Sequence, residues 1–356
     1  MNACVRRAED FAQSLGLSVP LLLAPMAGVP APALSIEIAK AGAMGACGVL
    51  FMQPGEIADW TAKFRAAGAT SLQLNTWTPQ PAPERSARIE GEMRNFLAQW
   101  GPEVAPSAGD QTPPDFSAQC EAMLSARPTC VSSIMGLFPA RYVARLNEAG
   151  VKWFATATTV AEARAAAQAG ADAIIAQGAE AGGHRGAFDA DVAERSMAGL
   201  FALLPAIVDA VDVPVIAAGG IGDARGFAGA LALGAHAVMI GTAFLRCPEA
   251  QSPAAYSAAL ARAQPEDTLV TRAFSGRPGR SLATGFALAA QSAGAPRAAP
   301  YPVQRGLTAQ MRSKALKEND VERMQAWAGQ SARLAQARPA GEIVQSLWRG
   351  AREILA

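Results

Sequence analysis

Short apolar runs and alanine-rich polar stretches alternate along the chain from about residue 20 to residue 245. Each run is continuously apolar, so both of its faces are expected to be covered by other elements. The eight runs occupy residues 21–28, 44–49, 71–77, 130–135, 151–157, 173–178, 214–220 and 237–245. This pattern predicts short strands of a parallel sheet.

The stretches between these runs have the features of helices. Those at 31–42, 139–150, 159–170 and 223–234 each end in glycine, the residue that most often closes a helix. Eight strand–helix units predict an α/β fold, a (β/α)8 TIM barrel, over residues 1–245. A doubly wound open sheet is the alternative. It normally carries a GxGxxG turn after its first strand, and APMAGVP lacks that spacing.

Two regions interrupt the alternation. Residues 78–115 hold one charged amphipathic stretch framed by proline-rich loops, which predicts an inserted helical segment after the third strand. Residues 246–356 lack strong strand signals and predict a helical C-terminal extension that packs on the barrel. Within it, residues 319–336 are expected to form helices and loops.

The charge balance narrows the class of partner. The chain of 356 residues has 31 Lys and Arg and 30 Asp and Glu, without a basic block, so nucleic acid is not an expected partner. No run is long enough to span a bilayer, which predicts a cytoplasmic protein without membrane contact. The five cysteines are scattered without CxxC spacing, so neither a disulfide framework nor a metal site is expected.

The barrel prediction places the active site at the carboxyl ends of the strands. Glycine-rich turns follow the seventh and eighth runs, and their backbone N–H groups would suit a phosphate. Such a phosphate belongs to a sugar phosphate or to flavin mononucleotide (FMN). The amides Asn75 and Gln177 suit the edge of a polar heterocycle, and APMAG at the first run offers backbone amides and a thioether, which together favour a flavin.

The chain has only two histidines, and the predicted barrel separates them. His236 precedes the eighth run, at the end of the barrel opposite the active site, where a structural role is expected. His184 follows the sixth run in the loop AQGAEAGGHRG, above the active-site rim. A neutral imidazole there would accept a proton from a weakly acidic carbon.

The segments APMAGV, AQGAEAGGHRG, PVIAAGGIGDARG, LGAHAVMIGTAFL, FSGRPGR and WAGQSARL together resemble the class I nitronate monooxygenases, formerly called 2-nitropropane dioxygenases. The resemblance covers nearly the whole chain in the correct order. It implies an FMN-dependent barrel that oxidises alkyl nitronates, characteristically propionate 3-nitronate, with dioxygen to carbonyl compounds and nitrite. Nitroalkanes are further candidate substrates.

The resemblance also implies roles for individual residues. His184 would be the catalytic residue, as a base or, when protonated, as a stabiliser of the anion, and Ser133 and Tyr301 would contact substrate. Residues expected to bind FMN are Ala24, Pro25, Met26, Asn75, Gln177, Gly182, Gly183, Gly219, Gly220, Met239, Ile240, Gly241 and Thr242. The phosphate would lie on Gly219, Gly220 and the run from Met239 to Thr242.

Three features depart from the family pattern, and other functions stay open. The fourth run reads VSSIMGLFP where the family more often has a sequence like VSFxFG. Arg305 stands where the motif YPxxNxLT commonly has asparagine, and the insertion 78–115 would reshape the pocket mouth. An FMN-dependent enoyl-acyl-carrier-protein reductase is the alternative enzyme, and a flavin- or phosphate-binding protein without activity is the alternative of another class. A barrel like inosine-monophosphate dehydrogenase is excluded because its loop cysteine is missing. The oligomeric state stays open.

Overall fold

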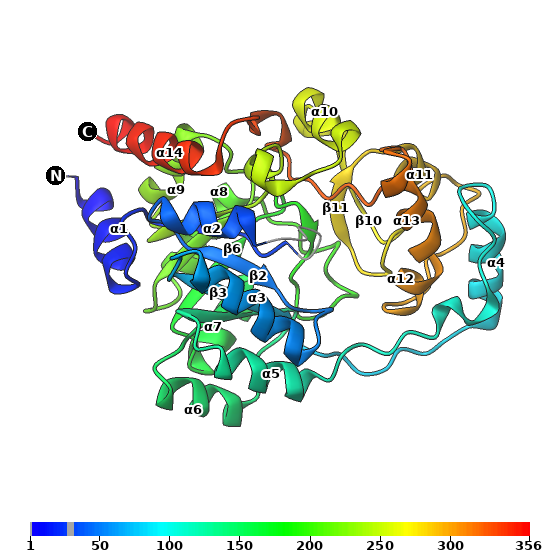
Figure 1. The fold of residues 1–356 in the computed structure, drawn as a ribbon, viewed down its shortest axis with the longest axis horizontal. Coiled ribbons are helices and arrows are strands. Elements are labelled where there is room, and N and C mark those ends of the chain that lie inside the picture. The colour runs from blue at the N-terminus through cyan, green and yellow to red at the C-terminus, as the bar shows by residue number, and fades with distance from the viewer. Residues whose placement is uncertain (1, 27–31) are drawn as a thin grey trace.

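Eight parallel strands form a closed barrel in the computed structural model, which describes residues 2–26 and 32–356 (Figure 1). The end of the predicted first run, residues 27 and 28, lies outside the described residues. Neighbouring strands follow the order β1-β9-β8-β6-β5-β4-β3-β2, and a parallel bridge between Leu22 and Met44 joins β1 to β2. The strands are β1 Leu21–Leu23, β2 Gly45–Gly48, β3 Leu72–Trp77, β4 Cys130–Ile134, β5 Lys152–Ala157, β6 Ala173–Gln177, β8 Val215–Ala218 and β9 Ala237–Ile240.

Helices surround this barrel and follow its strands in the predicted order. They are α2 Ala33–Lys40, α3 Pro54–Ala66, α5 Phe116–Ser125, α6 Ala140–Glu148, α7 Val160–Gln168, α8 Leu200–Val208 and α9 Ala224–Ala232. The last helix, α14 Ala340–Ile354, packs between α9 and α2 and completes the ring. The N-terminal helix α1 Ala3–Ser14 lies against α9 and β9. The (β/α)8 prediction is therefore confirmed.

Each strand buries both of its faces, which explains the continuous apolar runs. In β1, Leu22 packs inside the barrel with Met44 and Ile216, whereas Leu21 and Leu23 pack outside it against the helices. Phe11 from α1 joins the interior cluster and covers the end of the barrel opposite the predicted active site. Among the described residues, no helix is both long and apolar enough to span a membrane.

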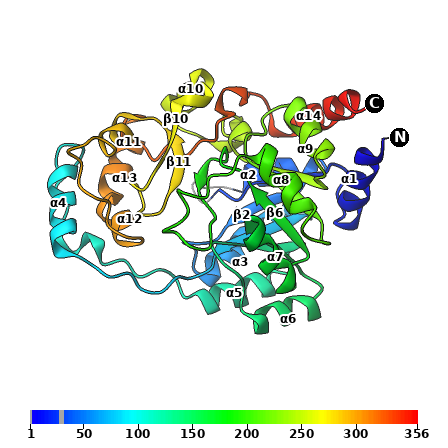
Figure 2. The ribbon, with the colours of Figure 1, turned by 180° about the vertical axis from the view of Figure 1, so that it is seen from behind.

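The insertion and the C-terminal extension pack on each other beside the barrel (Figure 2). Met93 and Leu97 of α4 Ala87–Leu97 share an apolar cluster with Phe286, Leu307 and Met311 of the extension. After α4 comes the 3₁₀ turn η1 Pro106–Gly109. The helices of the extension are α10 Ala254–Arg262, α11 Gly285–Ala289, α12 Val303–Leu307 and α13 Ala309–Lys317, with short 3₁₀ turns η2 Thr242–Phe244, η3 Pro248–Ala250 and η4 Pro265–Asp267 between β9 and the strands that follow.

The extension also contains strands, which the sequence pattern did not predict. Strands β10 Thr268–Thr271 and β11 Gly279–Leu282 form an antiparallel sheet with β7 Gly183–His184. Residues 319–336 were expected to form helices and loops, and the structure has no α-helix there. They form turns, a bridge between Trp327 and Ser281, and the 3₁₀ turn η5 Ala332–Leu334. These strands are short and rich in Thr, Arg and Gly, and β7 pairs with residues almost a hundred positions away. The local sequence pattern therefore does not predict them.

Candidate functional site

A cavity of about 430 Å³ opens at the carboxyl ends of the barrel strands. Its volume lies within the range typical of small-molecule and cofactor sites. His184 and all thirteen residues predicted to bind the cofactor line it. The ends of all eight barrel strands, the loop that contains His184 and the C-terminal extension are therefore brought together at the rim that the sequence predicted.

One end of the cavity is formed by the glycine turns after β8 and β9. Gly219 and Gly220 have φ values of 113° and 69°, which favour glycine. The backbone N–H groups of Gly220, Gly241 and Thr242 have no acceptor among the described residues. The carboxylate of Asp223 caps the first turn of α9. Free donors for a phosphate are therefore supplied by the turns and not by the tip of α9.

The deep wall of the cavity is made of side-chain amides on β3. Gln73 and Asn75 point to the same side because alternate residues of a strand share a face. Both donate to Ser132 Oγ of β4, at 2.7 and 2.8 Å. Gln73 is fully buried, and its Oε1 has no hydrogen-bond partner. Sequence reasoning missed Gln73, although its spacing two residues before Asn75 was an available signal.

Gln177 holds the loop that carries His184. Its Nε2 donates to the carbonyl of His184 at 3.1 Å, and its Oε1 accepts from the N–H of Gly186 at 2.8 Å. The Gln177 carbonyl accepts from the buried guanidinium of Arg185 at 2.6 Å. Gln177 therefore fixes the conformation of this loop as well as lining the cavity.

His184 lies between two tryptophans. The centroid of its ring is 4.7 Å from that of Trp77 and 4.9 Å from that of Trp327, both in edge-on geometry. Its Nε2 is 2.8 Å from Ser275 Oγ in the segment FSGRPGR. Burial, with smaller effects of nearby Arg277 and Arg305, lowers the pKa of His184 to about 3. The imidazole is therefore neutral near pH 7.

The segment around Trp327 is attached through its backbone N–H groups to Thr242 and to the loop that contains His184. Gly329 N–H donates to Thr242 Oγ1 at 3.0 Å, and Gln330 N–H donates to the carbonyl of Glu180 at 3.0 Å. A Cβ on Gly182 would lie 2.5 Å from the nitrogen of Gly329, closer than atoms pack. Glycine at both positions allows this approach, which accounts for WAGQ in the tail.

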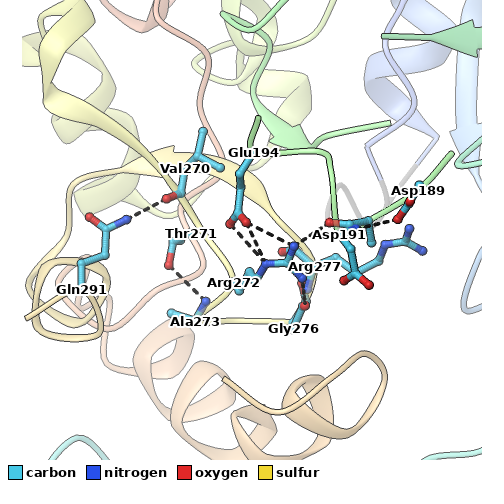
Figure 3. Close-up of polar contacts among 12 residues, drawn as sticks. Asp189, Asp191, Glu194, Val270, Thr271, Arg272, Ala273, Gly276, Arg277 and Gln291 are labelled. Carbon is cyan, nitrogen blue, oxygen red and sulfur yellow. Dashed lines mark hydrogen bonds and ion pairs between the residues drawn. The ribbon is translucent and has the colours of Figure 1, made fainter. Parts of the chain in front are cut away.

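Another loop of the extension is joined to the chain that follows His184. Arg272 forms an ion pair with Glu194 at 3.2 Å and donates to the carbonyl of Ala190 at 2.6 Å and of Gly276 at 3.3 Å (Figure 3). These contacts fix the segment from Ser275 to Arg277 beside the loop. The extension therefore positions both Ser275 and Trp327 at His184.

The prediction that Ser133 contacts substrate is wrong. Ser133 faces the helices, where its Oγ accepts from Trp153 Nε1 at 3.0 Å, whereas its neighbour Ser132 lines the cavity. The reason is the alternation of side chains along β4. Tyr301, the other residue expected to contact substrate, is not in the described lining, and its ring centroid lies 5.0 Å from that of Trp77, which is.

The charged side chains in the described lining of the cavity are two arginines. Arg305 and Arg312 line its mouth, and no Asp, Glu or Lys accompanies them in the described lining. The guanidinium carbon of Arg305 lies 3.8 Å from the centroid of the Phe51 ring. Sequence reasoning singled out Arg305 but missed Arg312. Within residues 2–26 and 32–356, no three His, Cys, Asp or Glu side chains are grouped closely enough to hold a metal ion.

Comparison with known proteins agrees with this arrangement. A nitronate monooxygenase from Paraburkholderia phytofirmans is 36% identical over 341 residues, covering 94% of this chain and 93% of the relative. A solved structure of nitroalkane oxidase from Streptomyces ansochromogenes has a TM-score of 0.88 at 34% identity, covering 98% of this chain and all of the other. FabK from Thermotoga maritima has a TM-score of 0.75 at 27% identity, covering 98% and 96%.

The family model of the nitronate monooxygenases matches nearly the whole chain. The match runs over residues 11–350, from α1 through the barrel and the extension to α14. It therefore includes the loop with His184, the glycine turns and the tail segments that meet at the cavity. The chain belongs to the nitronate monooxygenase family.

Proposed function

We propose that this protein is an FMN-dependent nitronate monooxygenase that converts alkyl nitronates, with dioxygen, to carbonyl compounds and nitrite. One observation carries the proposal. In a chain of the nitronate monooxygenase family, the neutral His184 and the thirteen residues expected to bind FMN line the same cavity. Propionate 3-nitronate is the first candidate substrate, and neutral nitroalkanes are further candidates.

The residues at the cavity fit FMN at both ends. Free N–H groups of Gly220, Gly241 and Thr242 suit its phosphate. The unpartnered Oε1 of Gln73 suits an N–H donor of the flavin ring, because a buried carbonyl oxygen without a partner costs about 1–3 kcal/mol. When bound, the flavin would accept electrons from the nitronate and pass them to dioxygen.

The state of His184 supports nitronates over neutral nitroalkanes as substrates. A base whose conjugate acid has a pKa of about 3 removes a proton from carbon poorly, because proton transfer is most efficient when the pKa lies near the working pH. A nitronate has already lost that proton. We propose that His184 acts as a neutral hydrogen-bonding group that orients the nitro end.

The first test is an absorbance spectrum of the purified protein, followed by oxygen uptake and nitrite release with propionate 3-nitronate. We expect a bound flavin spectrum and turnover that falls strongly in His184→Asn. A protein that binds FMN but consumes no oxygen with propionate 3-nitronate or nitroethane would support a binding function without activity.

The enoyl-acyl-carrier-protein reductase is the second candidate, because FabK shares this fold at 27% identity. Anaerobic mixing with NADPH separates the two functions. Rapid bleaching of the flavin by NADPH would overturn the nitronate proposal, whereas an unchanged flavin spectrum would support it.

A further inference from the structure

The mouth of the cavity has an unbalanced positive charge. Its described lining contains Arg305 and Arg312 but no acidic side chain, and His184 is neutral. Besides burial, Tyr301 affects the pKa of Arg305 and Arg305 affects the pKa of Arg312, and no carboxylate is among the groups that shift either pKa. Burial without an anion also lowers the pKa of Arg312 to about 10. Partly buried cations normally have an anionic partner. The described residues supply none here, so the two arginines are suited to an anion that comes with a ligand.

The two guanidinium groups are held by neutral contacts that leave donors free. Arg312 Nε donates to Thr308 Oγ1 at 3.1 Å, and its Nη2 donates to the carbonyl of Arg305 at 2.9 Å. Its Nη1 has no acceptor in the described chain. The Arg305 guanidinium lies over the Phe51 ring and has no side-chain hydrogen bond to the described residues. A stacked guanidinium keeps its N–H edge available for a carboxylate.

The position of the pair separates it from the phosphate end of the cavity. Arg305 belongs to α12, near Tyr301, which packs on Trp77 beside His184. The phosphate donors lie on the turns after β8 and β9, where Gly329 of the tail is bound to Thr242. The free guanidinium donors therefore serve the substrate side of the cavity.

We propose that Arg305 and Arg312 bind a second, non-reacting carboxylate of the substrate and so select nitronates that carry one. This inference rests on the proposed function. It assigns to Arg305, the residue that replaces the family's common asparagine, the role of choosing between substrates that react identically at the nitro end. The carboxylate accepts hydrogen bonds from both guanidinium groups while the nitronate lies toward His184.

The test compares two nitronates of matched length, propionate 3-nitronate and butane 1-nitronate, which differ mainly in the terminal carboxylate. For the wild type we expect kcat/KM to be about 10- to 100-fold higher for propionate 3-nitronate, the range of a charge-assisted hydrogen bond. Arg305→Asn should reduce that preference about tenfold or more, because kcat/KM should fall much further for propionate 3-nitronate than for butane 1-nitronate. Lys317→Gln, which removes an exposed charge from α13, is the matched control and should keep the preference.

A measurement without turnover completes the test. Succinate should shift the flavin absorbance of the wild type and of Lys317→Gln with a measurable Kd, and its affinity should fall in Arg305→Asn and in Arg312→Gln. Equal preference in wild type and Arg305→Asn would overturn the inference. Loss of FMN affinity in Arg305→Asn would do the same, because the arginine would then serve the cofactor phosphate. No turnover of either nitronate by the wild type would instead contradict the proposed function.

Discussion

His184 Nε2 lies 2.8 Å from Ser275 Oγ, and the two residues come from segments 91 positions apart. Ser275 is buried, and its hydroxyl also contacts the backbone of Arg277. This hydrogen bond fixes the orientation of the imidazole from the side of the extension. The loop that contains His184 supplies the histidine, and the extension decides where its ring points.

Removing this hydrogen bond should affect kcat more than KM. In Ser275→Ala the imidazole loses a directional partner, and misplacement of an orienting group by a fraction of an ångström is costly, so we expect kcat to fall about tenfold. Steady-state kinetics with propionate 3-nitronate provide the measurement. In a His184→Asn background the same change should have little further effect, because the two residues act as one unit. Additive losses in the double variant would contradict the coupling.

The lowered pKa of His184 predicts how stability depends on pH. Unfolding returns the imidazole from a pKa of about 3 to its ordinary value of 6.5, so the unfolded chain binds more protons between these values. The stability that comes from this group is present above pH 6.5 and is lost as the pH falls toward 3. Between pH 7 and pH 5 the loss should be ~2 kcal/mol.

Urea unfolding of wild type and His184→Gln at pH 7 and pH 5 measures this contribution as a difference of differences. Titration of other groups cancels in the comparison. The wild type should lose more stability than the variant over this interval. An equal loss in both proteins would mean that His184 keeps its ordinary pKa in the folded state.

Replacing each of two adjacent serines by alanine should affect a different property, FMN affinity for Ser132 and stability for Ser133. Ser132→Ala leaves Gln73 Nε2 without its acceptor and leaves Asn75 Nδ2 with only the Ser132 carbonyl, so FMN affinity should fall about tenfold. Ser133→Ala removes only the partner of Trp153 Nε1, so unfolding free energy should fall by about 1–3 kcal/mol with FMN affinity unchanged. Fluorescence titration of FMN and urea unfolding measure the two effects. A similar loss of FMN affinity in both variants would contradict this placement.

The close approach between tail and loop makes Gly329 sensitive to any side chain. In Gly329→Ala the new Cβ would lie 2.7 Å from the carbonyl oxygen of Glu180 and 3.0 Å from the nitrogen of Gly182. Because both atoms are backbone, the tail must move, at a cost of about 1–3 kcal/mol. We expect weaker FMN binding and a lower midpoint of unfolding.

Gly294→Ala is the matched control for this change. Gly294 lies in the same extension, and a Cβ there would have no atom within 4 Å. FMN titration and thermal unfolding should leave this variant close to the wild type. A Gly329→Ala protein that behaves like Gly294→Ala would show that the tail does not need to contact the loop so closely.

The local pattern predicted the barrel and most of its rim because both follow from short-range rules. A parallel strand covered on two faces has to be apolar throughout, as Leu21 to Leu23 are, and its carboxyl end has to face the active site. The same rule alone assigned His184 to the active-site end of the barrel and His236 to the opposite end. The prediction for Ser133 was wrong because the sequence around Ser132 and Ser133 on β4 does not indicate which of the two side chains faces the barrel interior.

The sequence by itself determined the order of the strands, the glycine turns and the presence of His184 at the rim, since each depends on residues within about one strand–helix unit. Only the tertiary structure decided the surroundings of His184. Trp327 and Arg312 reach the cavity from the extension, and Ser275 reaches His184, through pairing of β11 with β7 and the hydrogen bond from Gly329 N–H to Thr242 Oγ1. Such contacts depend on how distant segments pack, and neither periodicity nor composition specifies that.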